Sequence, residues 1–259
     1  MPIDFHNEEL SAAYSNRTPD QSWPEMINGL TAGVSGKIVA DIGCGGGIYT
    51  RILAELDADE VFGIDFSPTI LGKAIKDSTE YKRISYRLGN AVHTGLASSS
   101  CDIVLLRAVI HHLPELVNSF IEANRILKPQ GILLIQDRTP DDCFLEGSPN
   151  HIRGYFFSAY PQLKKIELIK RYTDQEVNTS MEKAGFTVQP SREFWENRAV
   201  FTTIEELEED IISRKGRSIL HELTDVDLCS LVAYMKEKVN GKTPIVDRNR
   251  WSVWKGIKN

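Results

Sequence analysis

The chain has 259 residues, of which 41% are apolar and 25% charged, and its formal net charge at pH 7 is -6. This length suits one large α/β domain or two small ones, and the composition argues against a largely disordered chain. The acidic balance disfavours bulk binding of nucleic acid or of an anionic membrane.

The cysteines show neither a CxxC pair nor the spacing of metal ligands, so the sequence predicts no disulfide scaffold and no metal site. They stand at Cys44, Cys101, Cys143 and Cys229. No run reaches the roughly 18 apolar residues of a membrane helix. The opening segment, MPIDFHNEEL, lacks the basic region and apolar core of a signal peptide. We therefore expect a cytoplasmic protein with no membrane partner.

From Lys37 onward, short apolar runs alternate with amphipathic stretches. Strands are expected at residues 38–40, 61–65, 84–88, 103–106 and 132–135. Helices are expected around 48–56, after the helix-opening pair Ser67-Pro68, and around 117–127, with a turn at 128–131. Strands that alternate with helices at this spacing predict an α/β fold, a doubly wound parallel sheet with helices on both faces.

The pattern changes after Asp137. Residues 139–170 mix Pro, Gly and aromatic residues without steady periodicity, which suggests an insertion folded over one edge of the sheet. The later elements are expected to be a helix at 173–184 ended by Gly185, a strand at 186–195, amphipathic segments at 204–212 and 228–239, and a strand at 251–257.

A glycine-rich segment, DIGCGGG, follows the first expected strand and begins at Asp41. Ligands of open parallel sheets bind beyond the carboxyl ends of the strands, and glycines allow the backbone to approach them closely. The alternative is a tight strand-to-helix turn without a ligand. Asp65 ends the second strand, about 18 residues past Gly47. A carboxylate at this position can accept hydrogen bonds from both ribose hydroxyls, or it can merely cap the next helix. The glycine spacing differs from that of a dinucleotide fingerprint, which disfavours a nicotinamide dehydrogenase.

The segments DIGCGGG, GIDFS, GNA, LKPQG and HHL together resemble the class I S-adenosylmethionine-dependent methyltransferases, and most closely the methyltransferase type 11 group. The resemblance runs from about Lys37 to Asp137. It implies a Rossmann-like, mostly parallel seven-stranded sheet, S-adenosylmethionine as cofactor, and an insertion that covers the cleft.

The resemblance also implies which residues bind the cofactor. They are Tyr14, Asp41, Gly43, Cys44, Gly45, Asp65, Phe66, Asn90, Ala91, Val92, Arg107 and Ala108. Asp41 and the glycine loop would line the methionine part, and Asp65 would hold the ribose. Phe66 and Val92 would flank the adenine. Arg107 and Ala108 would pass under the sulfonium end.

Two of these positions carry alternatives. The family commonly has Asp before Ala91, contacting the adenine amino group, whereas this chain has Asn90, whose carbonyl can still accept. Tyr14 lies in a segment that resembles the family's lid helix, and the alternative is that it packs in the core.

A sulfonium methyl group is already activated, so an enzyme mainly aligns the acceptor and excludes water. A general base is needed only for an acceptor that keeps its proton at neutral pH. His111 and His112, just past the fourth strand, are the candidates, although this pair can also serve as a plain loop connection. Arg138 and the Tyr155-Phe156-Phe157 cluster are softer candidates for the acceptor site.

We expect an N-terminal helical lid (1–36), a cofactor-binding core (37–138), a substrate-covering insertion (139–172) and a C-terminal completion of the same domain (173–259). The expected function is methyl transfer from S-adenosylmethionine to a small molecule, with no nucleic-acid partner. The alternatives are a methyltransferase acting on protein or tRNA, and a cofactor-binding regulatory protein without turnover.

Overall fold

The computed structural model describes residues 20–259 apart from residue 215, and these divide into two compact units. Unit 1 holds the described residues up to Asp137 together with Asp174–Arg192 and Ser252–Asn259, and unit 2 holds Arg138–Thr173 and Glu193–Trp251. Unit 2 buries an apolar core of its own.

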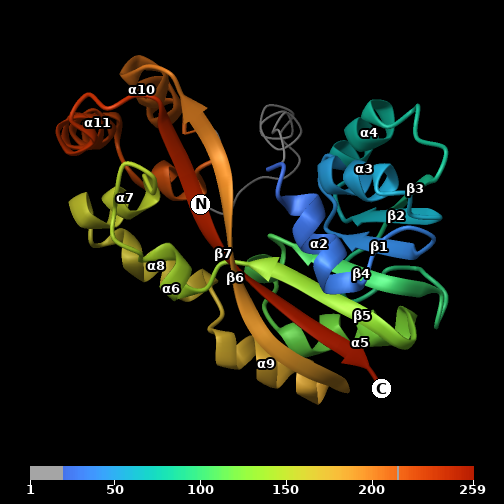
Figure 1. The fold of residues 1–259 in the computed structure, drawn as a ribbon. Coiled ribbons are helices and arrows are strands. Elements are labelled where there is room, and N and C mark those ends of the chain that lie inside the picture. Colours follow the sequence, from blue (N-terminus) through green and yellow to red (C-terminus); the bar gives the residue numbers. More distant parts are fainter. Residues whose placement is uncertain (1–19, 215) are drawn as a thin grey trace. The chain divides into compact units, whose positions relative to one another are not determined.

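The seven-stranded sheet has the order β3-β2-β1-β4-β5-β7-β6 (Figure 1). The strands are β1 (Ile38–Ile42), β2 (Glu60–Asp65), β3 (Ile84–Leu88), β4 (Cys101–Arg107), β5 (Leu127–Asp137), β6 (Phe186–Phe201) and β7 (Ile245–Lys258). β1 to β5 pair in parallel, and β7 runs antiparallel to β5. The predicted doubly wound, mostly parallel sheet is therefore confirmed, and the order reverses beside β1, the strand that leads into the glycine loop.

Helices cover both faces of the sheet in unit 1, with α3 and α4 on one face and α5 and α9 on the other (Figure 1). The helices of unit 1 are α2 (Trp23–Thr31), α3 (Ile48–Glu55), α4 (Pro68–Asp77), α5 (Leu116–Ile126) and α9 (Asp174–Lys183). Ser67 caps α4 as predicted, because its side chain accepts a hydrogen bond from the Ile70 amide. Helix α2 is fixed by its buried Trp23, whose Nε1 donates to Gln136 of β5 at 2.9 Å.

The predicted turn at 128–131 is wrong, because these residues lie inside β5 as an irregularity of the strand. Cys101 of β4 pairs with Leu127, but Ile103 pairs with Ile132, so the pairing offset changes from 26 to 29 residues. Turn-forming residues therefore bulge out of the strand without ending it. Beyond the bulge the register stays constant up to Arg107 and Gln136, just before Asp137.

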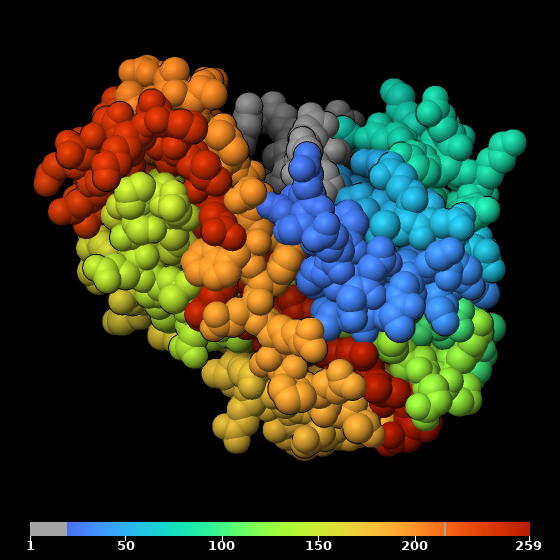
Figure 2. Space-filling view, in the orientation of Figure 1, coloured from blue at the N-terminus to red at the C-terminus, as the bar shows by residue number. Residues whose placement is uncertain are grey.

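Unit 2 is built from short helices around an apolar core. They are α6 (Pro140–Cys143), α7 (Arg153–Ala159), α8 (Leu163–Lys170), α10 (Ile204–Ile212), the 3₁₀ helix η2 (Ser218–Glu222) and α11 (Asp225–Val239). Figure 2 shows α7, α10 and α11 gathered together. Three of these helices form in the segment predicted to lack regular periodicity, because helices of four to eight residues have too few turns to establish a repeat.

The aromatic cluster Tyr155-Phe156-Phe157 belongs to the core of unit 2, where all three side chains are buried. The structure therefore places this candidate for the acceptor site in the core of unit 2. Among the residues that the structure describes, no helix is both long and apolar enough to span a membrane.

Candidate functional site

The loop after β1 is shaped by glycines in the left-handed region of backbone conformation, with φ of +74° at Gly43, +53° at Gly45 and +74° at Gly47. A Cβ on Gly43 would lie 2.3 Å from a methyl group of Val109, so this glycine is required by packing as well. A Cβ on Gly45 would meet no atom of the described residues within 4 Å, so among these residues the loop presents an open side there. Glycine at this point leaves both backbone and space accessible to a ligand.

Asp65, the last residue of β2, reaches across to this loop. Its carboxylate accepts hydrogen bonds from the Gly45 amide at 2.9 Å and from the Ser67 amide at 3.0 Å. Burial raises the pKa of Asp65, and these backbone hydrogen bonds work in the opposite direction. The predicted pair of features, a glycine loop and an acid at the end of the neighbouring strand, is therefore brought together in one place.

Asp41, at the end of β1, is almost completely buried beneath the same loop. Thr50 Oγ1, in the first turn of α3, donates to its carboxylate at 2.6 Å. Burial raises the pKa of Asp41 to about 6, although the Thr50 hydrogen bond and the positive charge of Arg107 lower it. Thr50 was not singled out from the sequence, because a threonine on a helix carries no pattern of its own.

Two large apolar side chains stand exposed at the carboxyl ends of neighbouring strands. Phe66 follows β2 and Val92 follows β3, and each is 52% exposed. Large apolar side chains are normally buried. Their exposure at the edge of the sheet where such folds bind ligands would suit contact with a flat apolar group of a ligand. Ala91, between Asn90 and Val92, is buried and helps to fix the turn that carries them.

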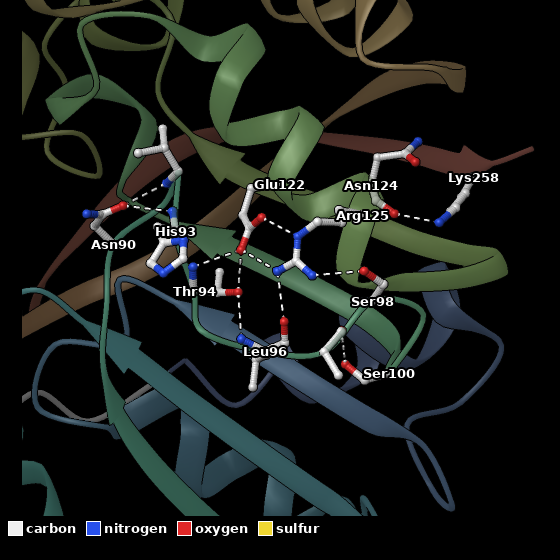
Figure 3. A network of polar contacts seen from close by, with 12 residues as sticks. Asn90, His93, Thr94, Leu96, Ser98, Ser100, Glu122, Asn124, Arg125 and Lys258 are labelled. Atoms are coloured by element: carbon white, nitrogen blue, oxygen red, sulfur yellow. Dashed lines mark hydrogen bonds and ion pairs between the residues drawn. The ribbon is translucent and has the colours of Figure 1, made fainter.

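The turn after β3 is held by a polar network on α5 (Figure 3). Glu122 accepts from the amide and the hydroxyl of Thr94, at 2.8 and 2.6 Å, and from Arg125 at 2.7 Å. Burial raises the pKa of Glu122, but the Arg125 and Thr94 hydrogen bonds outweigh this and lower it to about 2. Sequence reasoning missed this anchor, because an acid on an amphipathic helix resembles any solvated residue.

At the ends of β4 and β5, a histidine is paired with a buried carboxylate. His111 Nδ1 lies 3.0 and 2.8 Å from the two carboxylate oxygens of Asp137, which has no exposed surface. The ring of His112, the other candidate, lies against that of His111 with centroids 3.9 Å apart and an angle of 45° between the planes. The contact of His111 with Asp137 is the reason to rank His111 first of two neighbours that the sequence could not rank.

The remaining predicted residues after β4 lie next to the glycine loop. The Arg107 guanidinium lies 3.8 Å from the ring centroid of Tyr49 on α3. Ala108 adopts a left-handed conformation with φ of +55°, and its amide donates to Gln136 of β5. Tyr14 lies outside the described residues.

The softer candidate Arg138 belongs to unit 2, together with two further buried or half-buried arginines, Arg198 and Arg250. Arg198 pairs with Asp210, Arg250 pairs with Asp142, and the guanidinium of Arg138 lies 4.7 Å from the ring centroid of Trp251. Burial lowers the pKa of Arg138 to about 9. These side chains are integrated into the ionic and aromatic contacts of their own unit.

Comparison with known proteins matches residues 40–135 to the family model of the methyltransferase domain. A ubiquinone biosynthesis O-methyltransferase of Azorhizobium caulinodans is 32% identical over 103 residues, which cover 39% of this chain and 40% of that protein. A tRNA (carboxymethyluridine(34)-5-O)-methyltransferase of Mus musculus is 28% identical over 183 residues, 70% of this chain and 26% of that protein.

Among solved structures, a putative methyltransferase from an antibiotic biosynthesis pathway of Anabaena variabilis superposes with a TM-score of 0.70 at 20% identity. The alignment covers 92% of this chain and 98% of that one, which shows a shared fold. In sequence, the chain spans between 18% and 46% of the length of five curated relatives that it matches.

Proposed function

This chain belongs to the class I S-adenosylmethionine-dependent methyltransferases through its methyltransferase domain, and on that premise we propose that it transfers a methyl group to a small-molecule acceptor. The observation that carries the proposal is the pairing of His111 with the buried Asp137, beside the loop and carboxylate of a nucleotide site. Both features stand at the carboxyl edge of one parallel sheet, where such folds bind their ligands.

The residues of unit 1 suit this cofactor. The open side of Gly45 leaves room for a ligand against the backbone, and Asp65 offers carboxylate oxygens to ribose hydroxyls. Phe66 and Val92 would flank the adenine. The methionine part of the cofactor would be lined by Asp41, Gly43 and Cys44. Its sulfonium end would lie beside Arg107 and Ala108. When bound, S-adenosylmethionine supplies a methyl group on a positively charged sulfur, which is a good leaving group.

His111 would remove the acceptor's proton. An ionised carboxylate can only accept, so Asp137 fixes the proton of His111 on Nδ1 and leaves the lone pair on Nε2. That nitrogen would accept a proton from a hydroxyl or amine whose oxygen or nitrogen attacks the methyl group. Asp137 would hold the ring in place and stabilise it once it is protonated.

Two observations support a small acceptor over a nucleic acid. The net charge is -6, and nucleic-acid binding depends on neutralising phosphates with Lys and Arg. Of the named relatives, the one from Azorhizobium acts in ubiquinone biosynthesis. The tRNA-modifying relative is the reason to test the alternative directly. We assign the choice of acceptor to the segments outside residues 40–135, including 139–172.

The test is incubation of the protein with methyl-labelled S-adenosylmethionine and, in parallel, a small-metabolite extract, total tRNA and total protein. We expect label in the metabolite pool and none in the two macromolecular pools. The His111→Gln variant should lose this transfer, while His112→Gln should keep it. Label only in tRNA or protein would contradict the small-molecule proposal. Cofactor binding without label in any pool would support the regulatory alternative.

A further inference from the structure

Helix α8 has an inner side, which faces α6 and α7 of unit 2, and an outer side, which is exposed (Figure 1). Glu167, on the inner side, is buried, whereas Leu168 and Ile169 are 53% and 85% exposed. Of the four apolar residues of this helix, Leu163 is the one that is buried. Helices of globular proteins usually bury their Leu and Ile and expose their Glu, so the orientation of α8 has another cause.

That cause is an ionic anchor on the inner side. Glu167 lies 2.6 Å from Arg153 of α7 and 2.9 Å from Arg171, which follows α8. The thiol of Cys143, at the end of α6, donates to the same carboxylate at 3.5 Å. Removing the partners of a buried charge is strongly destabilising, so these contacts fix the rotation of α8 about its axis. The next two residues of the helix are thereby turned to the outer side.

Lysines flank the two exposed apolar side chains. They are Lys164, Lys165 and Lys170, and all three are exposed. The first two stand four residues before Leu168 and Ile169, the spacing at which side chains are neighbours on a helix surface. From residue 158 to residue 173 the single acid is Glu167, which is buried. The outer side of α8 therefore combines aliphatic groups with positive charge.

This combination matches the surface of a bilayer that contains anionic lipids. Aliphatic side chains can enter the boundary between headgroups and acyl chains, while flexible lysine side chains extend to the lipid phosphates. A nucleic acid would attract the lysines but would leave the aliphatic side chains without a role. The net charge of the whole chain is -6, so attraction to an anionic surface has to come from this local face, which would also orient the protein.

We propose that the outer side of α8 docks on an anionic lipid surface, with Leu168 and Ile169 entering the headgroup region and the three lysines meeting lipid phosphates. This goes beyond the proposed methyl transfer and does not depend on it. It departs from our expectation of no membrane partner, which rested on overall charge and on the length of a spanning helix. Neither argument applies to a short helix that lies in the plane of the membrane surface. A face of this size gives weak, reversible binding.

The experiment is flotation of the full chain with vesicles of phosphatidylcholine and phosphatidylglycerol, compared with vesicles of phosphatidylcholine alone. We expect binding to the mixed vesicles, weaker binding to the neutral ones, and release from the mixed vesicles by high salt. Ile169→Ser should weaken binding on the order of 10-fold, because one aliphatic side chain no longer enters the bilayer. Lys165→Gln should weaken it ~5-fold, because one positive charge is lost.

Val226→Ser is the matched control, because Val226 is 76% exposed on α11 but lies between Asp225 and Asp227. It should bind the mixed vesicles like the wild type, and all three variants should keep the wild-type melting temperature, since the changed side chains are exposed. No binding of the wild type to mixed vesicles would overturn the proposal, as would unchanged binding of Ile169→Ser. Equally tight binding to soluble polyglutamate would indicate an acidic protein partner and would also overturn it.

Discussion

The two units use buried charge in different ways. In unit 1, the carboxylates of Asp41, Asp65 and Asp137 are satisfied by a hydroxyl, by backbone amides and by an imidazole. In unit 2, buried carboxylates such as Asp247 are paired with guanidinium groups, here Arg217 at 2.8 Å, an arrangement that unit 1 uses for Glu122 and Arg125 on α5, away from these strand ends.

This difference indicates which carboxylates can interact with a ligand. A carboxylate held by amides, hydroxyls or imidazole keeps its negative charge, or shares it with a histidine, and can act on a ligand. A carboxylate paired with arginine is neutralised within the structure. Glu167 is the clearest case, with Arg153 at 2.6 Å and Arg171 at 2.9 Å. We therefore attribute reactivity to unit 1 and cohesion to the ionic network of unit 2.

The largest effect on activity should come from His111. His111→Gln removes the proposed base, and we expect kcat to fall ~10²–10⁴-fold, the usual contribution of general base catalysis. S-adenosylhomocysteine affinity and melting temperature should change little. His112→Gln is the matched control, and a comparable loss of kcat in that variant would contradict the assignment of the base to His111.

In unit 2 the largest effect should be on stability. Glu167→Gln leaves two buried guanidinium groups without their shared carboxylate, which costs about 3–5 kcal/mol in the free energy of unfolding. Chemical denaturation measures this directly. Asp225→Asn breaks an ion pair at an exposed carboxylate and should leave the denaturation midpoint nearly unchanged. If Glu167→Gln unfolded like the wild type, the structural role of this network would be wrong.

Next comes the ribose carboxylate. Asp65→Ala removes charged hydrogen bonds that contribute about 1.5–3 kcal/mol each, so S-adenosylhomocysteine should bind on the order of 100-fold more weakly. Isothermal calorimetry measures the change, with Asp59→Ala as an exposed control nearby. Unchanged affinity in Asp65→Ala would remove its ribose role. Tighter binding of NADH than of S-adenosylhomocysteine by wild type would contradict the cofactor itself.

The smallest effect concerns Asp41 and pH. Burial raises its pKa in the folded protein to about 6, above the value of 3.8 for an unperturbed aspartate, so the folded state holds the proton more tightly. Its contribution to stability is complete below pH 3.8 and is lost as the pH rises through 6. Asp41→Asn should therefore gain on the order of 1–3 kcal/mol relative to wild type between pH 4 and pH 8. Unfolding curves at both pH values measure it, and parallel pH profiles would count against the burial effect.

The sequence predicted unit 1 well because its signals are local. The positive φ of the loop glycines, the end of β2 at Asp65 and the Ser67 cap depend on a few adjacent residues, and the structure has them where expected. The amphipathic segment at 228–239 was also predicted and lies in α11, because a helix of fifteen residues gives a clear helical repeat. Local motifs and long helical repeats therefore predict helices and strands well.

What sequence reasoning missed depends on partners distant in the chain. The choice between His111 and His112 rests on Asp137, 26 residues away. The anchoring of Thr94 by Glu122 joins residues that are 28 positions apart. The ion pairs of unit 2 also join separate segments, such as Arg217 and Asp247. Periodicity carries no information on such pairings.

The bulge in β5 marks a position at which we expect changes of chain length to be tolerated. Because residues 128–131 leave the ladder and return to it, insertions or deletions there need not alter the register that places Asp137 beside His111. Lys128 and Gln130 lie at this edge with partly or fully exposed side chains. We therefore expect a fluorescent label or a short affinity tag introduced between them to leave the pairing of His111 with Asp137 intact.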